Sequence, residues 1–394
     1  MATTAELTET VTLEEPDHSR DWRLLVILLF CAWFGFGIYN GVFQNYLRDG
    51  IGVNPNQVGV LESIREVPGL ICALTVGALL AFAEARVAAL GLAIMAIGIA
   101  ATGMIDQYLP VLVMTVLWSI GFHVFAGVQP AIALTLAKGH ESGRRLGELN
   151  AVGSVANLAA LGLAALLAWL FVKLDYDVYF YLAGGFIFIA SLICFRLSPA
   201  ASARSGVKMV WRREYGMYYL LTFLEGCRRQ IVSTFAAFVL ILVYDVSLRD
   251  MILLHLIAGA VVAVTAPMIG RMIDVKSERG PLLVYSVATI VMFIGYATIP
   301  VLPVLMALFV IDKVMFSFSI GITTYMRRIV RKEDMTPTVA MGVTMNHVAA
   351  VALPVLGGYL WYQSNDYRIP FYIGIAVAVA AWVATYLLPR RSDA

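Results

Sequence analysis

Eight ionisable side chains lie inside long apolar stretches of the sequence, where a charge is costly to bury. A basic residue at the centre of a lipid-embedded helix costs about 2.5–3.5 kcal/mol, so it is expected to face a partner or a water-filled cavity. The set is formally neutral, which predicts a polar core that compensates its own charge. Its basic members are Arg65, Arg228, Arg229 and Lys313, and its acidic members are Glu62, Glu66, Glu225 and Asp312.

The segments 62–66 and 225–229 share one spacing of charges: an acid, a base three residues later and a second charge four residues later. Those positions lie on one face of a helix, so each segment predicts a compact charged patch. Burial and a neighbouring arginine act on a carboxylate in opposite senses, so such an acid can take up and release a proton. Its protonation frees the arginine to hold an anion. We expect one of the four acids to carry protons, and we favour Glu66 or Glu225 because each adjoins arginine.

The pair Arg228–Arg229 begins about twelve residues into its apolar stretch, which is ~18 Å along a helix and close to the middle of a bilayer. We expect this pair to form the cationic floor of a central cavity. One arginine should be paired with an acid, and the other should hold an anionic group through its forked donors. Polar residues at similar depth are further candidate substrate contacts, together with the two remaining basic residues: Asn40, Gln44, Arg65, His123, Lys313, Asn346 and His347.

A structural role is the alternative for each of these groups. Arg65 could pair with Glu62 only to hold helices together or to latch an outer gate. Asp312 could pair with a neighbouring arginine for the same purpose. His123 is as consistent with a packed, hydrogen-bonded histidine as with a functional one.

The composition shows what kind of chain must position these residues. The sequence has 394 residues, of which 60% are apolar and 14% charged, against about 25% charged in a soluble domain. A soluble protein of this length cannot bury so much apolar surface. A soluble enzyme, a nucleic-acid-binding protein and a disordered chain are therefore excluded. The 4 cysteines form no C-x-x-C pair, and neither a metal site nor a cofactor site is predicted.

Apolar runs long enough to cross ~30 Å of hydrocarbon as helices recur from Trp22 onward, after an acidic tail at 1–21 that we expect to be disordered. The chain is therefore predicted to be an all-α multi-pass membrane protein. The expected spans are 24–47, 56–82, 86–104, 109–137, 146–173, 178–197, 216–243, 248–273, 280–299, 303–326, 336–362 and 368–389.

The distribution of lysine and arginine predicts the orientation of these spans. With the amino terminus inside, 20 of the 28 basic residues fall in inside segments and 4 in outside loops. This bias predicts both termini in the cytoplasm, in a cell inner or plasma membrane. The longest internal polar stretch, 198–215, is a cytoplasmic linker between two bundles of six helices, 22–197 and 216–394.

The two halves echo each other at an offset near 200 residues. The run 118–121 reads Trp-Ser-Ile-Gly, and the run 318–321 reads Phe-Ser-Ile-Gly. Repeats of six spans are typical of secondary transporters, which hold their substrate near the midplane between the halves.

In span number, topology and internal repeat, residues ~20–390 resemble the major facilitator superfamily. The segment 270–276 resembles its signature loop, which has a glycine, an acid four residues later and then basic residues. The resemblance implies twelve helices in two pseudo-symmetric bundles. It also implies a cytoplasmic latch, and the first-half loop departs from the pattern because Ala81 occupies its acidic position. The implied latch residues are Gly270, Arg271, Asp274 and Lys276, with Arg279 beside them.

The predicted function is secondary active transport of a small anionic or zwitterionic organic solute by alternating access, coupled to protons or another ion. No phosphate-binding Gly-x4-Gly-Lys-Ser/Thr loop is present, so the chain does not itself encode ATP drive. A proton-driven exporter of an amphipathic compound or lipid is the alternative, and a channel is a third. No motif of a membrane enzyme is found. Beyond substrate, coupling ion and lipid bilayer, we expect no nucleic-acid partner and a monomer.

Overall fold

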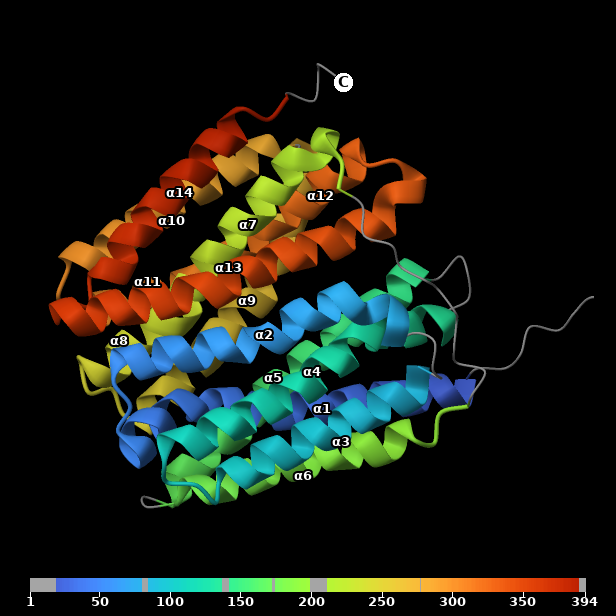
Figure 1. The fold of residues 1–394 in the computed structure, drawn as a ribbon, viewed down its shortest axis with the longest axis vertical. Helices are drawn as coiled ribbons and strands as arrows, with labels where there is room; N and C mark the ends of the chain where they lie inside the picture. Colours follow the sequence, from blue (N-terminus) through green and yellow to red (C-terminus); the bar gives the residue numbers. More distant parts are fainter. Residues whose placement is uncertain are drawn as a thin grey trace, which may run out of the picture.

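The computed structural model describes residues 19–79, 84–136, 142–171, 174–198, 211–276 and 278–389. In these ranges every regular element is helical, as the long apolar runs predicted (Figure 1). The first half contains α1 (Ser19–Tyr46), the π-helical turn η1 (Leu47–Ile51), α2 (Pro55–Leu79), α3 (Glu84–Thr102), α4 (Tyr108–Leu136), α5 (Ser142–Leu170) and α6 (Tyr176–Cys194).

The second half begins with the 3₁₀ turn η4 (Arg213–Tyr215). In this half two long helical segments are interrupted by a short turn of another helix type. The first consists of α7 (Gly216–Ile231), η5 (Val232–Ala236) and α8 (Ala237–Leu242), and the second of α11 (Leu302–Phe316), η6 (Ser317–Ser319) and α12 (Ile320–Ile329). The other helices are α9 (Leu248–Lys276), α10 (Arg279–Thr298), α13 (Met335–Ser364) and α14 (Ile369–Tyr386), with η7 (Lys332–Asp334) before α13.

Counted with these interruptions, the described ranges contain twelve long helical segments, six in each half, as predicted. Within the described residues, ten of them are long and apolar enough to cross a membrane. The other two are α2 and the segment α7–η5–α8, which carry the two charged patches. These two helical segments carry six of the eight charged residues, and α11 carries the other two, Asp312 and Lys313.

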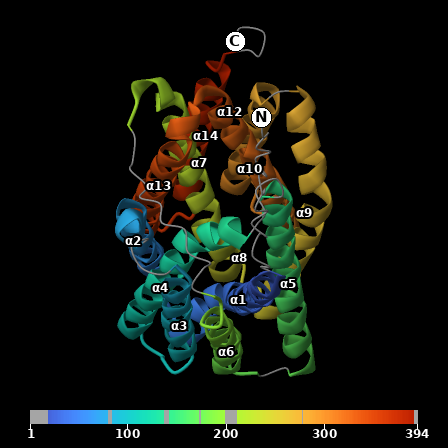
Figure 2. The same cartoon turned by 90° about the vertical axis from the view of Figure 1, so that its right-hand side faces the viewer.

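The two halves pack as separate bundles that meet along two pairs of helices. Helix α2 lies beside α13, and α5 lies beside α9, on opposite sides of the interface (Figures 1 and 2). At the first crossing a Cβ added to Gly59 would lie 2.3 Å from the Pro354 carbonyl oxygen, and one added to Gly358 would lie 2.4 Å from that of Pro55. Glycine at both positions therefore permits the close contact between the halves.

The end of the molecule where α1 and α8 finish is called here the joined end, and the end where α1 begins and α14 finishes is called the terminal end. Hydrogen bonds close the interface at the joined end. Arg48 donates to the Ile241 carbonyl at 2.6 Å and pairs with Asp245 at 2.6 Å. Asn45 donates to the Val246 carbonyl at 3.2 Å.

Candidate functional site

A cavity of about 250 Å³ lies between the two halves, in the part of the helices nearer the joined end. Both halves contribute to its walls: α1, α2 and α4 on one side, and the segment α7–η5–α8 with α9 and α11 on the other. Its charged and polar lining includes candidate residues predicted from the sequence, whereas aromatic rings cover much of the remainder. The lining residues are Tyr39, Asn40, Phe43, Gln44, Glu62, Arg65, Trp118, Ser233, Ala237, His255, Phe309 and Lys313.

A second cavity, of about 350 Å³, shares Asn40 with the first. Its other lining residues lie on α1, α4 and α5, including Leu29, Trp33 and Leu149, all nearer the terminal end than Asn40. The open volume therefore runs from the first cavity toward the terminal end, opposite the hydrogen bonds of the joined end.

The first-half cluster consists of Glu62, Arg65 and Glu66 on α2, with His123 on α4 and His347 on α13. Arg65 pairs with both carboxylates, at 2.7 Å from Glu62 and 2.7 Å from Glu66. Its side chain keeps 20% of its surface exposed, because it lines the cavity. The patch that the spacing predicted is thus formed within one helix turn.

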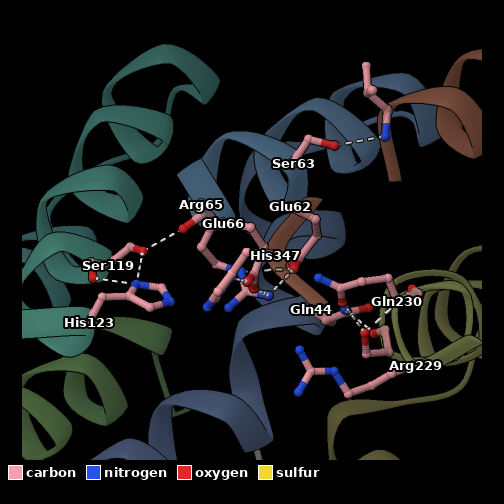
Figure 3. A network of polar contacts seen from close by, with 12 residues as sticks. Gln44, Glu62, Ser63, Arg65, Glu66, Ser119, His123, Arg229, Gln230 and His347 are labelled. Carbon is pink, nitrogen blue, oxygen red and sulfur yellow. Dashed lines mark hydrogen bonds and ion pairs between the residues drawn. The ribbon is translucent and has the colours of Figure 1, made fainter. Parts of the chain in front are cut away.

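His347 extends the first-half cluster across the interface between the halves. Its Nδ1 lies 3.0 Å from the Glu66 carboxylate (Figure 3). On α4, the Nδ1 of His123 lies 2.8 Å from the Ser119 carbonyl oxygen, and the two imidazole rings are 5.1 Å apart. A Cβ added to Gly69 would lie 2.5 Å from His123 Nε2 and 2.4 Å from His347 Cε1, so a glycine is needed where the rings meet.

The second-half cluster is built around Arg228 and lies within one half. Arg228 forms ion pairs with Glu225, at 3.1 Å, and with Asp312 on α11. The Tyr285 hydroxyl donates to Glu225 at 2.6 Å. The Arg228 side chain is 4% exposed, so its charge is compensated and shielded from the cavity.

Arg229 is partly buried and donates to the Asn346 side-chain oxygen at 2.5 Å. The cationic groups that line the cavity are Arg65 and Lys313, whereas Arg228 and Arg229 lie outside its lining. The Lys313 ammonium lies 5.0 Å from the centre of the Phe309 ring, a cation–π distance. The cationic surface of the cavity thus differs from the one expected from sequence.

The two charged helical segments of the second half depart from regular α-helix next to their charges. The π-helical turn η5 follows Arg229 after two residues, and the 3₁₀ turn η6 follows Lys313 after three. In α2, Pro68 stands two residues after Glu66, where it removes one backbone donor from the helix. Such interruptions often mark functional sites.

The predicted cytoplasmic latch is only partly within the described side chains. Gly270 has open space around its α-carbon, and Arg271 is exposed. Arg279 donates to the Tyr386 carbonyl at 2.6 Å, within its own half. The side chains of Asp274 and Lys276, and Ala81 of the first-half loop, lie outside the described residues.

An ion pair beyond the ends of the spans joins the linker to the loop before α13. Arg212 lies 2.7 Å from Asp334, and the Tyr215 hydroxyl donates to the same carboxylate at 2.9 Å. Burial alone would raise the pKa of Asp334, but hydrogen bonds from Tyr215 and Arg212 and the charge of Arg212 hold it below its ordinary value.

Sequence reasoning missed several residues of the two clusters. Tyr285 lies on a different helix from Glu225, and Ser119 donates to the backbone carbonyl of Arg65 rather than to a charge. Tyr39, Trp118 and His255 also line the cavity. Only the contacts between helices distinguish such residues from core residues.

Comparison with known proteins identifies one fold. A family model described as Major Facilitator Superfamily matches residues 25–326. No curated protein sequence matches the chain. A crystal structure of a mutant of the nucleoside transporter NupG gives a TM-score of 0.78 at 14% identity, covering 93% of this chain and 98% of that one.

Two further solved structures have the same fold. A bacterial homologue of the human lysosomal transporter Spinster, in an inward-facing and unoccupied conformation, gives a TM-score of 0.67 at 14% identity, with 95% of each chain covered. A D-xylose–proton symporter gives 0.66 at 14% identity, with 92% of this chain and 97% of that one covered.

Proposed function

The chain belongs to the Major Facilitator Superfamily and is a multi-pass membrane transporter of a small solute, and we propose that it moves an anionic or zwitterionic organic solute by proton-coupled alternating access. The observation that carries this proposal is the central cavity. Both halves line it, it is closed at the joined end, and it continues toward the terminal end. A carrier that exposes one site alternately to two sides needs this arrangement.

The lining of the cavity supports an anionic substrate. Lys313 reaches the cavity from α11, where its ammonium lies over the Phe309 ring and forms no ion pair within the described residues. Arg65 lies on the opposite wall, where Glu62 and Glu66 hold it. A carboxylate or phosphate of the solute would bind Lys313 directly and would compete with the two glutamates for Arg65. Tyr39, Phe43 and Trp118 would pack against its apolar part.

Proton coupling is assigned to Glu66. Its carboxylate contacts Arg65 in its own half and His347 in the other half, so its charge influences both substrate binding and the contact between the halves. Protonation would weaken both contacts together. Arg65 would then be available to the solute, and α13 could separate from α2. Glu225, the other favoured acid, contacts only groups of its own half among the described residues.

The orientation is proposed from the charge bias, with both termini in the cytoplasm. The terminal end then faces the cytoplasm, and the structure is an inward-facing state. Arg48, Asn45 and their partners form the closed outer gate in this assignment.

The test starts with a thermal-shift screen of the purified protein against organic anions, zwitterions and their neutral analogues, since a ligand stabilises the state that it binds. A radiolabelled hit is then followed in proteoliposomes under an imposed pH gradient. We expect Glu66→Gln to abolish accumulation against a gradient while counterflow remains. The matched variant Glu225→Gln should lose accumulation only in proportion to lost folded protein.

Three results would contradict the proposal. Accumulation by Glu62→Gln, Glu66→Gln, Glu225→Gln and Asp312→Asn alike would place the coupling elsewhere. Flux without counterflow would indicate a channel. Stabilisation by neutral amphipathic compounds alone would favour the exporter, whose substrate would use the aromatic and apolar wall of the second cavity at Trp33 and Phe36.

A further inference from the structure

We propose that Glu66, His123 and His347 form a binding site for a divalent transition metal ion such as Zn²⁺, and that the bound ion holds the two halves in the observed conformation. The three residues each offer one ligand atom, and these atoms lie within 4.8 Å of one another. Zinc is bound by imidazole nitrogen at about 2.0–2.1 Å and by carboxylate oxygen at about 2.0–2.2 Å. Movements on the order of 1 Å would bring the three atoms to those distances.

The surroundings of His123 prepare it as a ligand. A carbonyl oxygen can only accept a hydrogen bond, so the 2.8 Å contact with Ser119 places the proton of a neutral His123 on Nδ1. Its Nε2 then carries the free lone pair, and this atom lies beside Gly69, where the ring of His347 also approaches. In metal-binding histidines generally, a hydrogen bond from the other ring nitrogen fixes the orientation of the ring.

The other two ligands, Glu66 and His347, each present one atom toward the position of the ion. Arg65 occupies one oxygen of Glu66, and the other oxygen faces His347 Nδ1 at 3.0 Å. When the ion inserts, the Nδ1 proton of His347 moves to Nε2 through solvent, and the hydrogen bond is replaced by two coordinate bonds, one from Nδ1 and one from the Glu66 oxygen. Three protein ligands of the type His₂Glu leave a fourth position for water, as in open zinc sites.

The charge balance of the first-half cluster also favours a cation. Glu62 and Glu66 bring two negative charges, and Arg65 brings one positive charge. With both histidines neutral, these three groups of α2 have an excess of one negative charge in a largely buried place, where Glu66 is 5% exposed and Arg229 of the other half is the next cation. A divalent ion compensates this excess and satisfies the imidazole nitrogens at the same time.

The consequence for motion follows from the origin of the ligands. Glu66 and His123 belong to α2 and α4 of the first half, whereas His347 belongs to α13 of the second. The ion would therefore link the halves directly at the interface. An ion that links the halves would also inhibit transport. This consequence rests on the proposed function, whereas the binding of the ion and the link between the halves do not.

The binding experiment uses purified, metal-free protein titrated with ZnCl₂ in a calorimeter, with Co²⁺ absorption as a spectroscopic check of nitrogen coordination. We expect one ion per chain, and at least about tenfold weaker binding in His123→Gln, His347→Gln and Glu66→Gln. The matched control is His255→Gln, which removes a histidine of the central cavity outside the trio. Unaltered zinc affinity in the trio variants, or loss of binding in the control, would overturn the site.

Two further measurements separate the parts of the inference. Melting temperatures without metal show whether each variant is folded, and the parent alone should gain thermal stability from Zn²⁺. Spin labels at Arg86→Cys and Arg327→Cys, in a background without the four native cysteines, report the separation of the halves at the terminal end. Zn²⁺ should narrow this distance distribution in the parent and leave it unchanged in His347→Gln. Zinc binding without a narrower distance distribution would refute the link between the halves but would still support the binding site.

Discussion

The charged clusters of the two halves start from the same spacing and end in different surroundings. In the first half, Arg65 has two carboxylates and still keeps 20% of its side chain exposed in the cavity. In the second half, Arg228 also has two carboxylates but is only 4% exposed. The first-half cluster reaches across the interface through His347, whereas the second-half cluster stays within its own bundle.

This difference indicates which charges can change during transport. A fully enclosed pair holds its protons and its partners, because separating it would leave a bare charge in a dry interior. A cluster that touches a cavity can exchange partners with a solute, a proton or water at smaller cost. We therefore assign a structural role to Arg228 and a working role to Arg65 and Glu66, although the spacing alone treated them alike.

The largest expected effect is on stability, from removal of the central base of each cluster. Arg228→Met leaves the buried carboxylates of Glu225 and Asp312 without their shared arginine and should cost about 3–5 kcal/mol of folding free energy. Arg65→Met should cost clearly less, because water in the cavity can hydrate the acids left behind. Denaturation of both variants in the same detergent tests this. Equal losses would remove the basis for assigning the clusters different roles.

A substrate-binding effect is expected at Lys313, the other base of the cavity. Lys313→Met removes a charge-assisted contact worth about 1.5–3 kcal/mol, which is roughly a ten- to hundredfold loss of affinity for an anionic substrate. Lys313→Arg should retain most of the affinity. Binding is measured by calorimetry with the hit from the ligand screen. If the methionine variant binds as tightly as the parent, the anion does not contact this wall.

A smaller effect distinguishes the two adjacent arginines of α7. Arg229 lies outside the cavity lining and donates to the neutral side chain of Asn346, so a solute reaches its forked donors only by displacing that contact. Arg229→Lys should weaken substrate binding several-fold, since one lost hydrogen bond is worth about 0.5–1.5 kcal/mol. Arg228→Lys should alter stability rather than affinity. The reverse pattern in paired binding and melting measurements would place the substrate against the second-half cluster after all.

The smallest effect serves as a reference outside the membrane. The lowered pKa of Asp334 means that its ion pair contributes stability above the ordinary aspartate pKa, and that this contribution is lost as the pH falls through the lower, folded value. Asp334→Asn should therefore lower the melting temperature slightly at pH 7 and flatten its decline on acidification. A steeper decline in the variant would contradict this assignment.

Much of the fold could be predicted because helices that cross a membrane are encoded by long apolar runs of sequence. The positions of α9 and α14, for example, follow from run length alone, and the charged patches of α2 and α7 follow from helical spacing. The surroundings of those patches could not be predicted. Whether Arg65 or Arg228 meets the cavity depends on how the helices are rotated and on partners such as Tyr285 and His347, which belong to distant helices. A single sequence contains no local signal for such contacts.

Helices α2 and α13 cross at Gly59 and Gly358, near the joined end, so a rotation of one helix against the other would pivot about this contact. From Gly59, Glu66 lies seven residues along α2 and Leu79 lies twenty, which correspond to arms of ~10 Å and ~30 Å. A rigid rotation about the crossing that moves Glu66 by ~1 Å would therefore move the far end of α2 by ~3 Å. A small displacement that makes or breaks the contact between Glu66 and His347 would therefore become a displacement about threefold larger at the opening of the cavity. A larger side chain at Gly59 or Gly358 would shift this pivot. It would change how far the helix ends move without touching any charged residue.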